Sequence, residues 1–146
     1  MAKKKKKIPL RTQLRRLATK ADKALSLYIR AKTAIDFNGK CPFCKINPIQ
    51  ACFHFVRRRR KVLRWDERNV VGSCHKDNYL EYRDPDPYRA WYIRHNGQQK
   101  YLDLVDESSK SFEPTVEFLQ NMVDIYTKKL IFLLDKSNEA DTADSK

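Results

Sequence analysis

All four cysteines of this 146-residue chain fall between positions 41 and 74. The first two form the sequence Cys41-Pro42-Phe43-Cys44, in which a tight turn brings two thiolates together as half of a tetrahedral metal site. Cys74 stands just before a predicted helix and supplies the second half. This feature constrains the fold most, because a core this small would take much of its folding free energy from the bound metal.

Three residues compete for the fourth ligand. Asp77 lies three positions after Cys74, where a paired knuckle normally has a second cysteine. Aspartate can bind zinc, and this spacing places it on the same side of the first helical turn as Cys74. His75 and Cys52 are the alternatives. We predict a structural Zn²⁺ ion held by Cys41, Cys44, Cys74 and Asp77; the alternative is a set of reduced, buried cysteines.

The charge of the chain favours a polyanionic partner. The formal net charge is +13, with 31 Lys and Arg against 18 Asp and Glu. Such a chain gains free energy from nucleic acid, because neutralised phosphates release condensed counterions. Five consecutive basic residues, Arg57, Arg58, Arg59, Arg60 and Lys61, form the densest run near the cysteines and are expected to attract phosphate. A ribosome-like structural protein is the alternative reading of this charge.

The sequence predicts a cytoplasmic protein. No apolar run approaches the roughly 18 residues of a membrane span. The basic run Lys3–Lys7 is not followed by the apolar segment that a secretory signal needs. A reducing compartment also agrees with metal-binding rather than disulfide-bonded cysteines.

Two long helices flank the cysteine region. In residues 9–38 the apolar residues recur at alternating steps of four and three and predict one helix that ends at Asn38-Gly39: Leu10, Leu14, Leu17, Ala21, Ala24, Tyr28, Ala31 and Ile35. Residues 111–136 contain a second such stripe, expected to pack on the first helix or on a second copy of the chain. Residues 1–8 and 137–146 are predicted to be a disordered basic arm and a disordered tail.

The region between these helices, residues 39–108, is predicted to be a small metal-bound domain. Ala51–Val56 is rich in strand formers, and Val62–Trp65 is expected to be a second short extended piece. Helical patterns follow from Cys74 to about Arg83, from Pro87 to about His95 and from Gln98 to Glu107. The whole chain is therefore predicted to be a mostly helical α+β protein.

The order of residues within this domain resembles the HNH, or ββα-metal, endonucleases. These have metal cysteines, a strand histidine, a loop asparagine, then a second metal half followed by Asn or His, matched here by His54, Asn69, Cys74 and Asn78. The stretch Arg64-Trp65-Asp66-Glu67-Arg68-Asn69-Val70 is similar to the NinG-type recombination nucleases of phages and the endonuclease VII-like Holliday-junction resolvases. Two residues depart from the pattern. Phe53 stands before the histidine, where Asp or His commonly binds metal, and Asp77 takes the place of the fourth zinc cysteine.

The resemblance implies a role for each matched residue and a ββα-metal core between the long helices. His54 would be the general base that activates water, Asn78 a ligand of a catalytic Mg²⁺ or Mn²⁺ ion, and Asn69 the residue that holds the loop near His54. Arg57, Arg58 and Arg64 would hold the DNA backbone. The family also implies branched DNA as substrate, a two-fold homodimer and a bacterial host cytoplasm. The rival hypotheses are a catalytically inactive zinc protein that binds DNA or RNA, and a ribonucleoprotein component.

Overall fold

The computed structural model describes residues 6–145 and shows a mostly helical α+β protein, as predicted. Its helices are α1 (Leu10–Asp36), α2 (His75–Leu80), α3 (Asp86–Asn96), α4 (Gln98–Ser108) and α5 (Val116–Ala143). Its strands are β1 (Ala51–His54) and β2 (Val70–Ser73), which pair antiparallel with Phe53 opposite Val71. Most of the predicted arm at residues 1–8 lies outside the described residues.

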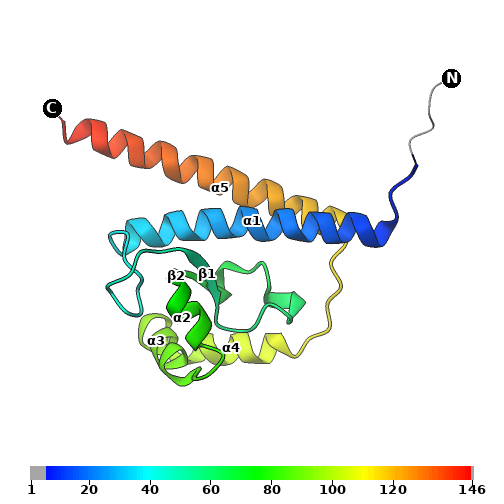
Figure 1. Ribbon diagram of the computed structural model, residues 1–146, viewed down its shortest axis with the longest axis horizontal. Coiled ribbons are helices and arrows are strands. Elements are labelled where there is room, and N and C mark those ends of the chain that lie inside the picture. Colours follow the sequence, from blue (N-terminus) through cyan, green and yellow to red (C-terminus); the bar gives the residue numbers. More distant parts are fainter. Residues whose placement is uncertain (1–5, 146) are drawn as a thin grey trace.

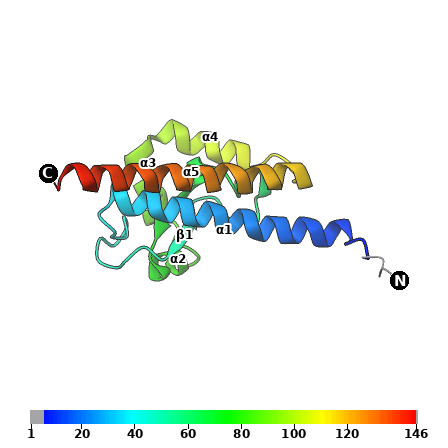
Figure 2. The ribbon, with the colours of Figure 1, turned by 90° about the horizontal axis from the view of Figure 1, so that it is seen from above.

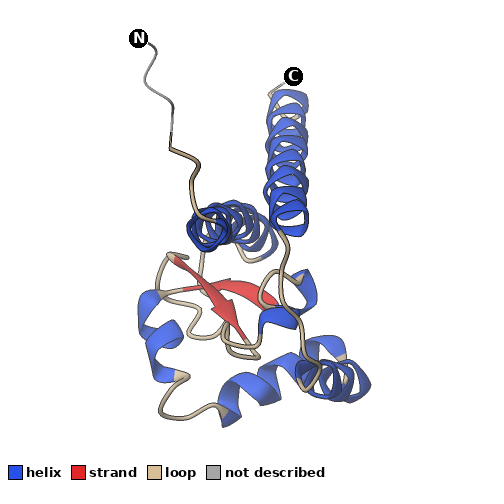
Figure 3. Cartoon of the chain, turned by 90° about the vertical axis from the view of Figure 1, so that its right-hand side faces the viewer, coloured by secondary structure: helices blue, strands red, loops and turns tan. Residues whose placement is uncertain are grey.

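Helix α1 lies between α5 and the sheet (Figure 3). The helices α1 and α5 run side by side in the same direction and diverge toward the C-terminal end of α5 (Figures 1 and 2). This parallel arrangement is possible because residues 37–115 carry the chain back to the beginning of α1. The predicted packing of the last helix on the first is confirmed by a shared core: Ala21, Leu25, Ile29, Trp65, Val70, Leu119 and Tyr126.

The buried face of α1 is wider than the predicted stripe. Leu25 and Ile29 are almost fully buried although the stripe omitted them, whereas Leu10 and Ile35 of the stripe are exposed. The reason is that α1 contacts two partners, α5 and the sheet, so no single helical stripe describes its core face.

Gly72 fixes α1 against the sheet. Its backbone N–H donates a hydrogen bond of 2.8 Å to Thr33 Oγ1 of α1. A Cβ atom added at Gly72 would lie 2.9 Å from Thr33 Cβ and 2.8 Å from Ile49 Cγ2, so only glycine permits this approach. The predicted stop of α1 is also confirmed, since Asn38 and Gly39 have φ angles of 52° and 75°.

Two predicted boundaries are wrong. Val62–Trp65 is not a strand: Lys61–Leu63 is a 3₁₀ turn, as is Glu67–Asn69, and Val70–Ser73 pairs with β1 instead. Residues 137–143 continue α5 rather than beginning a disordered tail. Their polar composition suggested disorder, but the segment contains neither Gly nor Pro to end a helix. Among residues 6–145, no helix combines the length and apolar content needed to cross a membrane.

Candidate functional site

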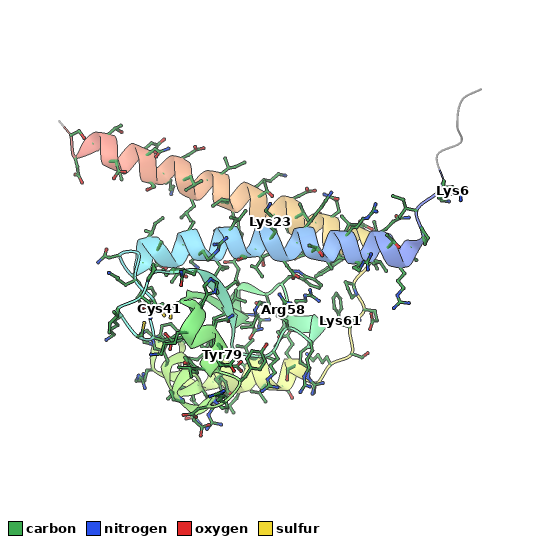
Figure 4. All side chains as sticks on the ribbon, viewed as in Figure 1. Lys6, Lys23, Cys41, Arg58, Lys61 and Tyr79 are labelled. Atoms are coloured by element: carbon green, nitrogen blue, oxygen red, sulfur yellow. The ribbon has the colours of Figure 1, made fainter. Side chains whose placement is uncertain are left out.

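Four side chains predicted to bind metal converge on one point. The ligating atoms of Cys41, Cys44, Cys74 and Asp77 all lie within 4.8 Å of one another. Cys41 and Cys44 come from the loop after α1, whereas Cys74 and Asp77 come from the beginning of α2. We call this group the metal knuckle; Cys41 marks its place below the C-terminal end of α1 in Figure 4. These residues could hold a metal ion such as zinc.

The distances fit a tetrahedral ion. Bonds of about 2.3 Å to sulfur place two ligands about 3.8 Å apart. Cys44 Sγ and Cys74 Sγ are 4.0 Å apart, and Asp77 Oδ2 lies 3.2 Å from Cys41 Sγ and 3.0 Å from Cys74 Sγ. Three sulfurs and a carboxylate oxygen are donors that suit zinc.

Local backbone structure places each donor. The N–H of Cys41 donates to Asn47 O, and the N–H of Lys45, whose φ is 59°, donates to Cys41 O, which closes the turn around the first two cysteines. Cys74 is the N-cap of α2, and its Sγ accepts a hydrogen bond from the N–H of Asp77. This cap holds both residues on one side of the first helical turn, as the spacing predicted.

The Asp77 carboxylate is fully engaged in the metal knuckle. One oxygen faces Cys41 and Cys74, and the other accepts a hydrogen bond of 2.9 Å from Tyr88 Oη. Burial raises the pKa of Asp77, but hydrogen bonds from Cys74, Cys41 and Tyr88 outweigh it and leave the pKa below its usual value. Burial raises the pKa of the Cys41 thiol to about 12, a shift that a bound cation opposes by stabilising the thiolate. Asp77 is therefore the fourth member of the group.

The two competing ligands lie elsewhere. Cys52 is outside the group, and burial raises the pKa of its thiol to about 12, which keeps it protonated. His75 is exposed at the beginning of α2 and is also outside the group. Both residues line a cavity of about 250 Å³ that His54 and Asn78 also line.

His54 and Asn78 line one cavity of about 290 Å³, which we call the His54 pocket. Strand β1 presents Cys52 and His54 to it, and α2 presents Asn78. The remaining lining residues bring charge and an aromatic ring: Arg57, Arg58, Glu81 and Tyr82. A neighbouring cavity of about 250 Å³ shares His54, Arg58 and Asn78 and extends to Asp22 of α1.

The imidazole of His54 is held in one orientation. Its Nε2 lies 2.9 Å from the carbonyl oxygen of Arg64. A carbonyl can only accept, so Nε2 carries the proton, and in the neutral ring Nδ1 carries the lone pair. Burial lowers the pKa of His54, and the charge of Arg58 acts in the same direction although the bond to Arg64 opposes them. The ring is therefore neutral near pH 7.

Asn69 holds the loop that carries the Arg64 carbonyl. Its side chain is fully buried; Oδ1 accepts from the N–H of Val56 at 2.7 Å, and Nδ2 donates to the carbonyls of Val56 at 2.8 Å and Leu63 at 3.1 Å. These bonds close the loop between β1 and the 3₁₀ turn next to Arg64. Asn69 thus braces the loop whose Arg64 carbonyl faces His54 Nε2.

The basic residues divide into two groups. Arg64 makes two hydrogen bonds to the Asp22 carboxylate, at 3.0 and 2.5 Å, and Lys61 pairs with Glu113. Within residues 6–145, the four arginines from 57 to 60 are exposed and have no ion pair: Arg57, Arg58, Arg59 and Arg60. Figure 4 shows Arg58 and Lys61 to one side of the metal knuckle, along α1. Arg64 therefore ties the loop to α1, whereas the exposed arginines are available to a phosphate backbone.

Phe53 faces away from the His54 pocket. It is 1 % exposed, and its ring packs against Phe43, Phe55 and Tyr88 at centroid distances near 5 Å. The alternation of a strand explains this, because residues 52 and 54 share one face and residue 53 takes the other. Position 53 is therefore part of an aromatic core.

Three residues that matter here were missed or misread in the sequence. Asp22 forms an ion pair with Arg64. The available signal in the sequence was that Asp22 is an acidic residue in a strongly basic helix. Tyr88 is a buried aromatic residue whose hydroxyl also orients Asp77, and no local pattern links the two positions. Glu81 lines the His54 pocket; its spacing of three from Asn78 was the available signal.

Comparison of the chain with models of known protein families, with curated proteins and with solved structures gave no match.

Proposed function

We propose that this protein is a metal-dependent endonuclease that hydrolyses phosphodiester bonds of DNA. The observation that carries the proposal is the His54 pocket, where a neutral imidazole and a carboxamide line one cavity beside exposed arginines. The metal knuckle supports it, because Asp77 and Asn78 are consecutive on α2 and a zinc ion at Asp77 would fix the position of Asn78. Zinc is proposed as that structural ion.

His54 would act as the general base. The lone pair on Nδ1 takes a proton from a water molecule while the water oxygen forms a bond to phosphorus. The bond from phosphorus to the leaving oxygen then breaks, and the leaving oxygen takes a proton from solvent. A Mg²⁺ or Mn²⁺ ion with Asn78 as one ligand would neutralise charge that develops on the phosphate and the leaving oxygen.

Asn69 and the arginines would have supporting roles. Asn69 keeps the Arg64 carbonyl at His54 Nε2, so the imidazole keeps the tautomer that a base needs. Arg58 lines the pocket and would hold the phosphate next to the scissile bond. Arg59 and Arg60 continue the positive surface and would contact the DNA backbone farther along.

Branched DNA and a homodimer are proposed from the resemblance to junction resolvases. Symmetric cleavage of two strands needs two copies of the pocket related by a two-fold axis. Helix α5 offers a surface for the second copy, since Ile131, Phe132 and Leu134 are exposed by 55 %, 62 % and 47 %. Analytical ultracentrifugation of the wild type and of Phe132→Asp checks the oligomeric state. A wild type that sediments as a monomer, like the variant, contradicts the dimer.

A second candidate function is nucleic-acid binding without catalysis. The observation that favours it is the burial of Phe53 in the aromatic core, because position 53 then gives no metal ligand. The same arginines would bind DNA or RNA in this case. RNA binding alone would favour a role in a ribonucleoprotein.

Cleavage assays separate these functions. Zinc-loaded protein is incubated with supercoiled DNA, four-way-junction DNA and single-stranded RNA, each with Mg²⁺ or Mn²⁺. We expect cleavage of DNA, reduced about 100-fold or more by His54→Ala while binding is retained. His95→Ala is the matched control, because that imidazole stacks on Trp91 outside the His54 pocket. Binding without cleavage under either metal would contradict the proposed activity.

A further inference from the structure

The His54 pocket contains one carboxylate that the roles above leave unused. Glu81 follows α2 directly and is 8 % exposed. Its backbone N–H bonds to Asp77 O, so the helical geometry continues to it. It lies three residues after Asn78, a spacing that places two side chains on the same face of a helix. Asn78 and Glu81 both line the pocket, in agreement with that spacing.

The Glu81 side chain is largely buried, and its carboxylate has no close cationic partner. Among the described residues, none donates a side-chain hydrogen bond to it and none forms an ion pair with it within 4.0 Å. Arg57 lines the same pocket and its charge acts on Glu81 from beyond ion-pair distance, while its guanidinium lies 5.2 Å from the centre of the Tyr82 ring. Neither Glu81 oxygen is fully enclosed without a partner, so the carboxylate opens onto the cavity that it lines and is available to a cation there.

A divalent ion in this pocket would also need a carboxylate. Mg²⁺ and Mn²⁺ prefer oxygen ligands and are commonly held by one or two carboxylates. Phe53 cannot supply one, and both oxygens of Asp77 face the metal knuckle and Tyr88. Asp22 lines the neighbouring cavity with His54 and Asn78 but is paired with Arg64, whereas Glu81 lines the His54 pocket without such a pair.

We propose that Glu81 and Asn78 together bind a divalent cation in the His54 pocket, with Glu81 supplying the carboxylate ligand that position 53 lacks. The proposal rests on the proposed endonuclease function for its biological meaning, but the cation site itself can be tested without cleavage. Its two protein oxygens come from one face at the end of α2, and His54 remains free as a base.

The test is a titration of zinc-loaded protein with Mn²⁺. Binding is measured from the electron paramagnetic resonance signal of the Mn²⁺ that remains free. We expect Glu81→Gln, which keeps the shape of the side chain, to weaken Mn²⁺ binding at least about tenfold. The matched control is Asp86→Asn, which removes an exposed carboxylate that shares a different cavity with Glu81. The control should bind Mn²⁺ as the wild type does. Equal binding by wild type and Glu81→Gln, or no binding by the wild type at millimolar Mn²⁺, overturns the proposal.

A second measurement needs no variant at Glu81. Mn²⁺ broadens the nuclear magnetic resonance signals of nearby groups, so the amide signals of Asn78, Glu81 and Tyr82 in the wild type should be lost first. First loss at another place in the chain overturns the proposed site. DNA cleavage is measured in parallel. If the wild type does not cleave DNA but Glu81→Gln still weakens Mn²⁺ binding, the endonuclease function is rejected and the cation site stands. If the wild type cleaves DNA and Glu81→Gln changes neither cleavage nor Mn²⁺ binding, the cation site is rejected and the endonuclease function stands.

Discussion

The metal knuckle and the His54 pocket share helix α2 but differ in how complete they are. In the metal knuckle, four donors from two distant segments meet within 4.8 Å, and hydrogen bonds from Asn47 and Tyr88 support them. In the His54 pocket, an imidazole, a carboxamide and a carboxylate line one cavity, and among the described residues no hydrogen bond joins these three side chains. The first arrangement suits a structural ion and the second a site that must admit water and phosphate.

Removal of the structural ion should have the largest effect. We expect Cys74→Ala, or zinc chelation, to unfold residues 39–108, because structural zinc contributes roughly 10 kcal/mol of apparent folding free energy in small domains. Zinc stoichiometry and hydrogen exchange measure this. The matched control is Cys52→Ala, a cysteine outside the metal knuckle, which should keep one zinc per chain. Equal zinc loss in the two variants would refute the assignment of ligands.

Loss of the loop anchor should come next. Asn69→Ala removes three hydrogen bonds and leaves the buried carbonyls of Val56 and Leu63 without a side-chain donor. We expect a loss of about 2–4 kcal/mol in the free energy of unfolding, with zinc retained. Urea unfolding measures it, with the exposed Asn121→Ala on α5 as control. A loss equal to that of the control would show that the loop does not depend on Asn69.

The exposed arginines should affect DNA binding but not folding. Arg58→Ala with Arg59→Ala is expected to reduce the slope of log K against log salt by roughly 1.8, about 0.9 for each lost phosphate contact on double-stranded DNA. Lys128→Ala with Lys136→Ala removes the same charge from α5, which lies on the far side of α1 (Figure 3). Fluorescence anisotropy at several salt concentrations compares the pairs. Equal slopes would mean that the positive surface beside the His54 pocket is not the DNA-binding surface.

The smallest effect concerns pH. The pKa of His54 is lower in the folded protein than its ordinary value of about 6.5. Between the folded pKa and that value the unfolded chain binds more protons, so the stability contributed by neutral His54 is present above about pH 6.5 and is lost as pH falls through the folded pKa. We expect His54→Gln to show a weaker loss of stability than the wild type over this range, measured by urea unfolding. A steeper loss in the variant would contradict a buried neutral His54.

Periodicity and spacing predicted much of the fold. The alternating apolar steps marked α1 and α5, Asn38-Gly39 marked the end of α1, and the spacing from Cys74 to Asp77 matched one helical turn. The second strand and the end of α5 were misplaced. Strand pairing is decided by which distant segment reaches β1, and a polar helix end looks like a tail when only composition is considered.

The sequence by itself determined the two metal halves, the positive charge and the order of His54, Asn69 and Asn78. Only the tertiary structure decided which donors meet, because Cys41 and Asp77 are brought together by packing and not by any local pattern. It also decided that Arg64 pairs with Asp22, that Phe53 turns into the aromatic core and that Glu81 enters the His54 pocket. Local propensity sets the direction of each side chain relative to its own element, whereas the partner depends on contacts between elements far apart in the chain.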